Sequence, residues 1–355
     1  MSFNINNRSL LKESVFFIAD IGANHDGSID KAIDLINLAS EAGADAVKFQ
    51  HFKAETIVSD YGFKNLNSDN NLSHQSKWKK SVFEVYKDAS ISLDWTEKIK
   101  KECDRLNITF FTSPYSLELV DYIDEFVGSY KIGSGDITWI EIIEKIAKKN
   151  KPTFLATGAS NMKEVEIAVS NFIKHNKNLC LMQCNTNYTG SDSNFKYVNL
   201  NVLKTFRKKF PDLTLGLSDH TKGHTTVLGA VALGAKAIEK HFTDNNSNDG
   251  PDHFFAMDPL SWKNMVEETR NLEKSMGKVE KIIESNEKET VILQRRSIRL
   301  NKNIKAGYKL NRSDLIPLRP CPIDAIKPDC ISKLIGKKTN KELKIHDYIK
   351  WEDIE

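Results

Sequence analysis

Two histidines end consecutive apolar stretches of the sequence, LTLGLSD at 213–219 and KAIEKHF at 236–242. His220 directly follows the first stretch, and His241 lies near the end of the second. Either residue alone is explained by a strand-end side chain that bonds a backbone carbonyl or caps the next helix. If the stretches are neighbouring parallel strands, which lie ~4.8 Å apart, the two imidazoles converge. Two imidazoles with open positions for water and substrate oxygens suit a divalent ion such as Mn²⁺.

Two lysines lie inside otherwise apolar stretches, Lys48 in DAVKFQ and Lys131 in SYKIGSG. Lysine is rarely buried without a partner, so each lysine either pairs internally with Asp20 or Asp136 or binds an anionic substrate. The turn GSGD favours the anion, because its glycines let backbone N–H groups converge on a phosphate or carboxylate and Ser134 adds a hydroxyl. Asp20 and Asp136 could hold metal-bound water or exchange protons with the substrate.

These residues need a scaffold that brings strand ends together. Short apolar, β-branched stretches alternate with stretches whose apolar residues recur at three and four spacing, the pattern of amphipathic helices. The predicted strands are 16–22, 45–50, 108–114, 129–135, 152–158, 179–185, 213–219 and 236–242, each followed by a predicted helix. Eight such units favour an α/β fold of the (β/α)8 TIM barrel type over an open doubly wound sheet.

In a TIM barrel the active site forms at the C-terminal ends of the strands. Most of the predicted strands end in polar residues, and such a cluster costs desolvation unless something is bound there. Besides the residues named above, we expect this rim to receive Gln50, Ser113, Asn185, Asn187, Tyr188, Ser218 and Lys240.

The βα alternation ends near residue 280. We predict a barrel domain at 1–280, a charged linker at 281–294 and a small β-rich domain at 295–355. The connection after the second strand, about 51–90, is unusually long and contains SHQSKWKK. Such a connection is either a lid, a specificity loop or an oligomer contact, or it is a surface excursion with one helix of its own.

The composition excludes several classes of protein. Fifty-one basic against 48 acidic side chains leave a net charge of +3, too balanced for a nucleic-acid or membrane-surface protein. The N-terminus lacks the pattern of a signal peptide, and no apolar run approaches the roughly 20 residues that span a bilayer. The five cysteines include no CxxC pair. We therefore expect a cytoplasmic protein with packed, reduced thiols.

In order and spacing, several motifs resemble those of the sialic acid synthases. They are IADIGANHDG, AGADAVKFQ, FFTSPYS, YKIGSGD, LATGA, GLSDHT, LGAVALGAKAIEKHFT and GPDHFFAMDP. The tail resembles the antifreeze-like (SAF) domain of that family, so the resemblance covers nearly the whole chain. It implies a transferase that joins phosphoenolpyruvate (PEP) to an acylamino sugar. C3 of PEP attacks the sugar aldehyde, water adds to C2 of PEP, and C–O cleavage releases phosphate and a nonulosonic acid.

The resemblance also implies roles for individual residues. PEP contacts are implied for Lys48, Ser113, Lys131, Ser134 and Ser218. Sugar contacts are implied for Tyr188, for Asn185 or Asn187, and for Arg319. The catalytic set is Asp20, Gln50 near a metal-bound water, Lys131 and Asp136. The metal on His220 and His241 is expected to be Mn²⁺, with Mg²⁺ or Co²⁺ as alternatives, and the small domain is expected to swap over the partner's barrel in a homodimer.

Departures from the family pattern bear on the acceptor sugar. Asp20 and Asp136 stand where the family usually has Glu, and each loses roughly 1.5 Å of reach. Together with the 51–90 connection, this predicts a shifted sugar pocket. We expect a relative of N-acetylmannosamine, either a 6-deoxy diamino hexose or a phosphorylated sugar. The alternatives are a synthase of seven- or eight-carbon deoxy-sugar acids and a non-catalytic carbohydrate-binding protein.

Overall fold

The computed structural model describes residues 3–5, 8–9, 14–66, 75 and 78–355. The chain divides into two compact units, Met1–Gly277 and Lys278–Glu355, and each is described by itself. A short antiparallel pair, β1 (Asn4–Ile5) and β2 (Arg8–Ser9), precedes the main sheet of the first unit.

Eight parallel strands close into a barrel in the first unit, as the alternating sequence pattern predicted. The strands are β3 (Phe16–Asp20), β4 (Ala46–His51), β5 (Thr109–Pro114), β6 (Tyr130–Ile132), β7 (Thr153–Ala156), β8 (Leu179–Cys184), β9 (Thr214–Asp219) and β10 (Ala237–His241). They follow one another in chain order, and β10 pairs with β3 to close the ring. Their side chains are almost entirely buried, because the barrel interior and the surrounding helices cover both faces.

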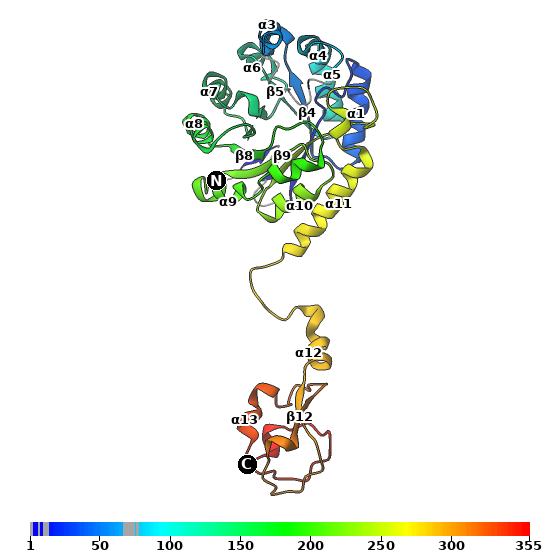
Figure 1. Cartoon of the computed structure of the whole chain (residues 1–355), viewed down its shortest axis with the longest axis vertical. Coiled ribbons are helices and arrows are strands. Elements are labelled where there is room, and N and C mark those ends of the chain that lie inside the picture. The colour runs from blue at the N-terminus through cyan, green and yellow to red at the C-terminus, as the bar shows by residue number, and fades with distance from the viewer. Residues whose placement is uncertain (1–2, 6–7, 10–13, 67–74, 76–77) are drawn as a thin grey trace. The chain divides into compact units, whose positions relative to one another are not determined.

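A ring of helices surrounds the barrel (Figure 1). The helices between and after the strands are α1 (Ile29–Glu41), α5 (Trp95–Arg105), α6 (Leu117–Ile123), α7 (Ile140–Lys148), α8 (Met162–Ile173), α9 (Val202–Lys209), α10 (Thr225–Ala232) and α11 (Pro259–Met276). Several begin at residues that suit a helix N-terminus. Ser28, Ser116, Asn161 and Asp258 each accept a hydrogen bond from a backbone N–H of the first turn.

The long connection after β4 contains more than the one helix that its simplest interpretation predicted. Its described part holds α2 (Ala54–Ile57), α3 (Asp60–Lys64) and α4 (Val82–Ala89). Part of the SHQSKWKK stretch lies outside the described residues, and its last three residues, 78–80, are described.

Strand register brings the predicted rim residues to the same level of the barrel. Asp20 on β3 lies opposite Lys48 on β4 and opposite His241 on β10. Gln50 on β4 lies opposite Ser113 on β5. Because all eight strands are parallel, these side chains share the C-terminal end of the barrel, where the active site of this fold forms.

The second unit is small and has its own core. It contains α12 (Lys288–Gln294), α13 (Ile331–Leu334) and an antiparallel pair, β11 (Ser297–Leu300) and β12 (Leu315–Leu318). Helix α12 lies within the segment predicted as a linker. Isolated bridges such as Ile304 with Leu343 join the turns around a core of aliphatic side chains. This agrees with the predicted β-rich character of the tail.

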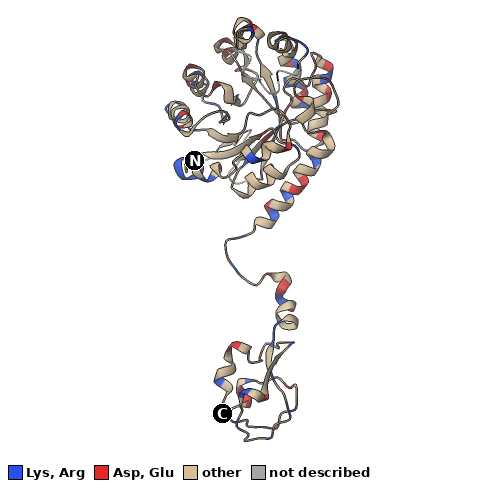
Figure 2. Cartoon of the chain, in the orientation of Figure 1, with Lys and Arg blue, Asp and Glu red and all other residues tan. Residues whose placement is uncertain are grey.

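Charges of both signs are spread over the outer helices, and α9 is the most evidently basic (Figure 2). All five cysteines are free. Cys180 and Cys184 are both buried, as expected, but Cys184 also lines the cavity at the end of the barrel. In the part of the chain that the structure describes, no helix is both long and apolar enough to cross a membrane.

Candidate active site

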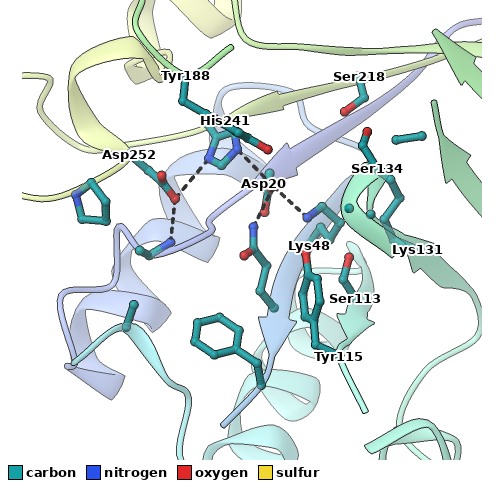
Figure 3. A pocket seen from close by; sticks show the side chains of 18 of the residues that line it. Asp20, Lys48, Ser113, Tyr115, Lys131, Ser134, Tyr188, Ser218, His241 and Asp252 are labelled. Atoms are coloured by element: carbon teal, nitrogen blue, oxygen red, sulfur yellow. Dashed lines mark hydrogen bonds and ion pairs between the residues drawn. The ribbon is translucent and has the colours of Figure 1, made fainter. Parts of the chain in front are cut away.

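A cavity of about 390 Å³ opens at the C-terminal end of the barrel, within the usual range for small-molecule sites. Figure 3 shows several of the side chains that line it. Among the residues predicted from the sequence, those that line the cavity are Asp20, Lys48, Gln50, Ser113, Lys131, Ser134, Asp136, Tyr188, Ser218, His220 and His241. With Ala156 of β7, which also lines the cavity, residues from all eight strands or the turns that follow them meet in one place.

Both lysines are buried and each is paired with a carboxylate. Lys48 Nζ lies 2.7 Å from Asp20 Oδ2, the aspartate proposed as its internal partner. Lys131 Nζ lies 2.5 Å from Glu239 Oε1, so its partner is neither of the two aspartates that the sequence suggested. Burial alone lowers the pKa of Lys48, but Asp20 and Glu239 outweigh burial and raise the pKa above its usual value. Lys48 therefore enters the cavity as a cation, and each lysine side chain is oriented by its carboxylate partner.

Asp20 is the most connected acid of the site. Its carboxylate accepts hydrogen bonds from Gly22 N at 3.0 Å and from Gln50 Nε2 at 3.2 Å, and it lies 3.4 Å from His241 Nε2. Burial raises the pKa of Asp20, but Lys48 and His241 lower it more, and the pKa falls to about 2. Asp20 is therefore ionised at neutral pH.

Three serines surround the lysines in Figure 3. Ser134 Oγ accepts a hydrogen bond from Gly158 N at 2.9 Å, and Ser218 Oγ donates to Glu239 Oε1 at 3.2 Å. Ser113 Oγ is buried without a hydrogen-bond partner. A buried hydroxyl without a partner is costly, and beside two ammonium groups it can donate to a bound phosphate or carboxylate.

The two histidines converge, with ring centroids 5.5 Å apart. His220 Nδ1 lies 2.8 Å from the backbone carbonyl of Asn185, so the tautomer with the proton on Nδ1 satisfies that carbonyl and leaves a lone pair on Nε2. This carbonyl contact is the usual outer support of a metal-binding imidazole. It is also the strand-end contact expected of a lone histidine, and the two interpretations are compatible.

His241 Nδ1 is buried without a hydrogen-bond partner and lies 3.5 Å from Asp252 Oδ2. A Cβ added to Gly22 would lie 3.0 Å from that nitrogen, so the glycine leaves room for the imidazole. No described set of three or more His, Cys, Asp or Glu side chains is arranged as a metal centre. The two converging imidazoles could supply an ion with two nitrogen ligands, and its other positions would be left to water or substrate.

Asp136 lies at the end of the turn η2 (Ser134–Asp136), which follows β6. Burial raises the pKa of Asp136 to about 6. A carboxyl with a pKa near the pH of the medium can both accept and return a proton, which Asp20, with its low pKa, cannot do.

Sequence reasoning missed several residues that line this cavity, among them Glu239, Asp252, Tyr115 and Cys184, whose Sγ lies 4.0 Å from His220 Nδ1. Glu239 could have been found, because a glutamate inside the apolar strand KAIEKHF is as unusual as a lysine in that position. It also lies two residues before His241, on the same face of the strand. Asp252 and Tyr115 follow their strands in loops, where no periodicity marks them. Asp252 Oδ2 accepts a hydrogen bond from Ala23 N at 3.1 Å.

Three predicted positions of the first unit do not line the cavity. Lys240 was expected at the rim, but it points to the outer face of the barrel and pairs with Asp219 at 2.5 Å. Neither Asn185 nor Asn187 lines the cavity. Arg319 belongs to the second unit, and its contact with a sugar stays a prediction.

The long connection supplies an apolar wall to the cavity. Its members are Phe52, Ile57, Trp78, Val85 and Tyr86. Rings of Phe52 and Tyr86 pack with centroids 5.5 Å apart. The described lysines of the basic stretch, Lys79 and Lys80, line a neighbouring hollow instead.

Comparisons with known proteins agree with this geometry. The model of the NeuB family matches residues 35–281, and the SAF domain model matches residues 295–355. The N,N'-diacetyllegionaminic acid synthase of Legionella pneumophila is 35% identical, over 96% of this chain and 94% of that protein. The pseudaminic acid synthase of Campylobacter jejuni is 31% identical, over 97% of each. The crystal structure of the N-acetylneuraminic acid synthetase of Leptospira borgpetersenii matches with a TM-score of 0.70 and 27% identity, over 82% of this chain and 95% of that one.

Proposed function

The chain belongs to the NeuB family and is a transferase, and we propose that it condenses PEP with the open-chain aldehyde of an acylamino sugar. The products are a nonulosonic, sialic-type acid and inorganic phosphate. One observation carries the proposal. The cavity is lined by two buried lysines, a serine hydroxyl without a partner, two converging histidines and Asp136, a carboxyl whose pKa burial raises to about 6.

The lysines supply the PEP subsite in this proposal. Lys48 and Lys131, with Ser113 and Ser134, would hold the phosphate and carboxylate of PEP through charge-assisted hydrogen bonds. In the free enzyme Asp20 and Glu239 compensate the charges of the lysines. The cations are thereby oriented before PEP binds.

The histidines supply the acceptor end. His220 and His241 would hold a divalent ion, most suitably Mn²⁺, with Mg²⁺ or Co²⁺ as alternatives. When bound, such an ion supplies Lewis-acid polarisation of the sugar aldehyde. Gln50, which donates to Asp20, would orient a water molecule in this proposal.

In this proposal a carboxyl group carries out the proton transfers. Attack by C3 of PEP on the aldehyde carbon forms the C–C bond and leaves an alkoxide, which needs a proton. The water molecule that adds to C2 of PEP releases a proton. Collapse of the tetrahedral intermediate then breaks the C2–O bond and releases phosphate. Asp136, with its pKa near 6, is our proposal for the group that takes and returns a proton, whereas Asp20 stays ionised and orients Lys48.

For the acceptor, we propose a 6-deoxy diacylamino hexose. The wall formed by Phe52, Ile57, Val85 and Tyr86 is apolar, and it suits a methyl group better than a phosphate. The described lysines of the basic stretch, Lys79 and Lys80, do not line this cavity, and Lys80 pairs with Asp88 at 2.5 Å. The diacetyl product in the name of the Legionella relative fits two acylamino groups.

The test is phosphate release from PEP with Mn²⁺ and a panel of acceptors. The panel contains N-acetylmannosamine, its 6-phosphate, a 2,4-diacetamido-2,4,6-trideoxy hexose and, for the shorter deoxy-sugar acids, arabinose 5-phosphate. The account predicts the highest kcat/KM for the trideoxy sugar. Preference for a phosphorylated sugar would contradict the acceptor assignment. Absence of release with every sugar would favour a carbohydrate-binding protein. Val85→Lys is expected to lower turnover of the trideoxy sugar more than turnover of the other acceptors. Lys101→Met, at an exposed position of α5, is the control.

We also propose a homodimer in the cytoplasm in which Arg319 of the small domain reaches the sugar on the partner's barrel. Sedimentation equilibrium tests the dimer. Mixing Arg319→Ala chains with Lys131→Met chains tests the exchange, because a mixed dimer would contain one complete site and regain activity. Unchanged activity after mixing would contradict a shared site.

A further inference from the structure

A buried ion pair lies on the outer face of the barrel, behind the two histidines. Lys240 Nζ lies 2.5 Å from Asp219 Oδ2, and the two residues are only 2% and 3% exposed. Thr221 and Thr226 donate their hydroxyls to the same carboxylate oxygen at 2.9 and 2.7 Å. Neither member of the ion pair lines the cavity, and the proposed reaction uses neither.

The ion pair fixes the chain on both sides of His220. Asp219 precedes this histidine and Thr221 follows it. Lys240 Nζ donates to the carbonyl oxygen of Thr221 at 2.6 Å as well as to Asp219. Thr221 N donates to Asp219 Oδ1 at 3.2 Å. One ammonium group therefore restrains both residues that flank His220.

The same lysine is the chain neighbour of His241. Asp219 on β9 lies opposite Lys240 on β10 in the sheet. Successive side chains of a strand point to opposite faces, so Lys240 points outward and His241 points into the barrel. The ion pair thus joins the ends of β9 and β10 at the residues next to both histidines.

We propose that Asp219 and Lys240 are positioning residues that fix the separation of the His220 and His241 imidazoles for metal binding. The inference rests on the proposed function, because it presupposes that these imidazoles hold a divalent ion. A metal site tolerates changes of only a few tenths of an ångström in its ligand positions. An ion pair that served stability alone could be replaced by uncharged side chains of similar volume without such an effect.

The experiment compares Lys240→Met with the double variant Asp219→Asn/Lys240→Met in the full-length protein. Mn²⁺ affinity is measured from the electron paramagnetic resonance signal of free Mn²⁺, PEP affinity by calorimetry without metal, and stability by thermal unfolding. Arg270→Met is the matched control. It removes an ion pair to Glu273 and a hydrogen bond to the Val15 carbonyl, at 2.7 and 2.9 Å, next to the start of β3.

We expect Lys240→Met to weaken Mn²⁺ binding by about ten-fold or more, the scale seen for outer supports of metal ligands, with PEP affinity kept. The double variant, which leaves no unpaired buried charge, should regain thermal stability without regaining Mn²⁺ affinity. Arg270→Met should lose stability and keep Mn²⁺ affinity.

Recovery of Mn²⁺ affinity together with stability in the double variant would overturn the inference, and so would wild-type affinity in folded Lys240→Met. If Lys240→Met does not fold, Thr226→Val replaces it. A smaller loss of Mn²⁺ affinity is then expected, and an unchanged Mn²⁺ affinity would overturn the inference. The variant His220→Ala distinguishes failure of the positioning inference from failure of the proposed function. If it binds Mn²⁺ as the wild type does, the metal assignment itself is wrong, and the positioning inference is overturned with it.

Discussion

Replacement of Asp136 by asparagine is expected to stabilise the barrel at neutral pH. Burial raises the pKa of this carboxyl from 3.8 to about 6. Between these values the folded protein binds more protons than the unfolded chain, so the free energy of unfolding falls as the pH rises through this window. The difference between the two pKa values corresponds to about 3 kcal/mol. Asparagine has the same shape but cannot ionise, so the variant does not lose this free energy of unfolding as the pH rises.

Thermal unfolding of wild type and Asp136→Asn from pH 4 to pH 8 measures the effect. The stability difference should be close to zero at pH 4, grow between pH 4 and 6, and level off near 3 kcal/mol, equivalent to about 6–12 °C for a domain of this size. Asp124→Asn is the control with the opposite sign. Burial raises the pKa of Asp124, but Lys151 and Tyr130 lower it more, so asparagine there should destabilise at neutral pH.

The reasoning would be refuted by a difference between wild type and Asp136→Asn that does not depend on pH. It would also be refuted by destabilisation at pH 8. The same variant should lose most phosphate release. A gain in stability together with a loss of activity is the behaviour expected of a residue held in place for function.

Two further variants test other parts of the site. Gly22→Ala puts a Cβ 2.6 Å from Asp252 Oδ2 and 3.0 Å from His241 Nδ1, at a residue with φ of +52°. The variant should lose about 1–2 kcal/mol of folding stability and bind Mn²⁺ more weakly, as measured by calorimetry. Unchanged Mn²⁺ affinity would count against the metal site. Lys131→Met leaves buried Glu239 with only the more distant Lys48, whose Nζ lies 4.0 Å from Glu239 Oε1. It should therefore lower the free energy of unfolding in denaturant, by less than the roughly 3–5 kcal/mol of a fully unpaired buried charge, and abolish stabilisation by PEP. Adding Glu239→Gln should restore stability but not the response to PEP, and a restored response would show that Lys131 does not contact PEP.

The barrel and most of the site could be predicted because both follow from periodicity. Alternation of apolar strands with amphipathic helices determines the fold, and strand ends in that fold share one rim. These two rules are enough to predict that Asp20, Lys48, Lys131, His220 and His241 lie together. For the buried lysines the sequence left two alternatives, an internal ion pair or binding of an anionic substrate. Lys48 shows that the two are compatible, because it pairs with Asp20 and also lines the cavity.

The errors have physical causes as well. Lys240 and His241 are adjacent in one strand, so both cannot face the barrel interior, and the alternation rule would have excluded Lys240 from the rim. Glu239 was missed although a glutamate inside an apolar strand is as unusual as a lysine. Asp252 was missed because it lies in a loop after the last strand. Its position depends on the contact with Ala23 N, which no local pattern encodes.

The most direct test of the central claim uses PEP that carries ¹⁸O in the oxygen bridging C2 and phosphorus. Wild-type protein, Mn²⁺ and the trideoxy diacetamido hexose are incubated together, and phosphate and the acid product are analysed by mass spectrometry. The account predicts that all of the label appears in inorganic phosphate and none in the product, since the C2–O bond is cleaved after condensation. Label retained in a new acid product, or no phosphate formed with any acceptor, would contradict it.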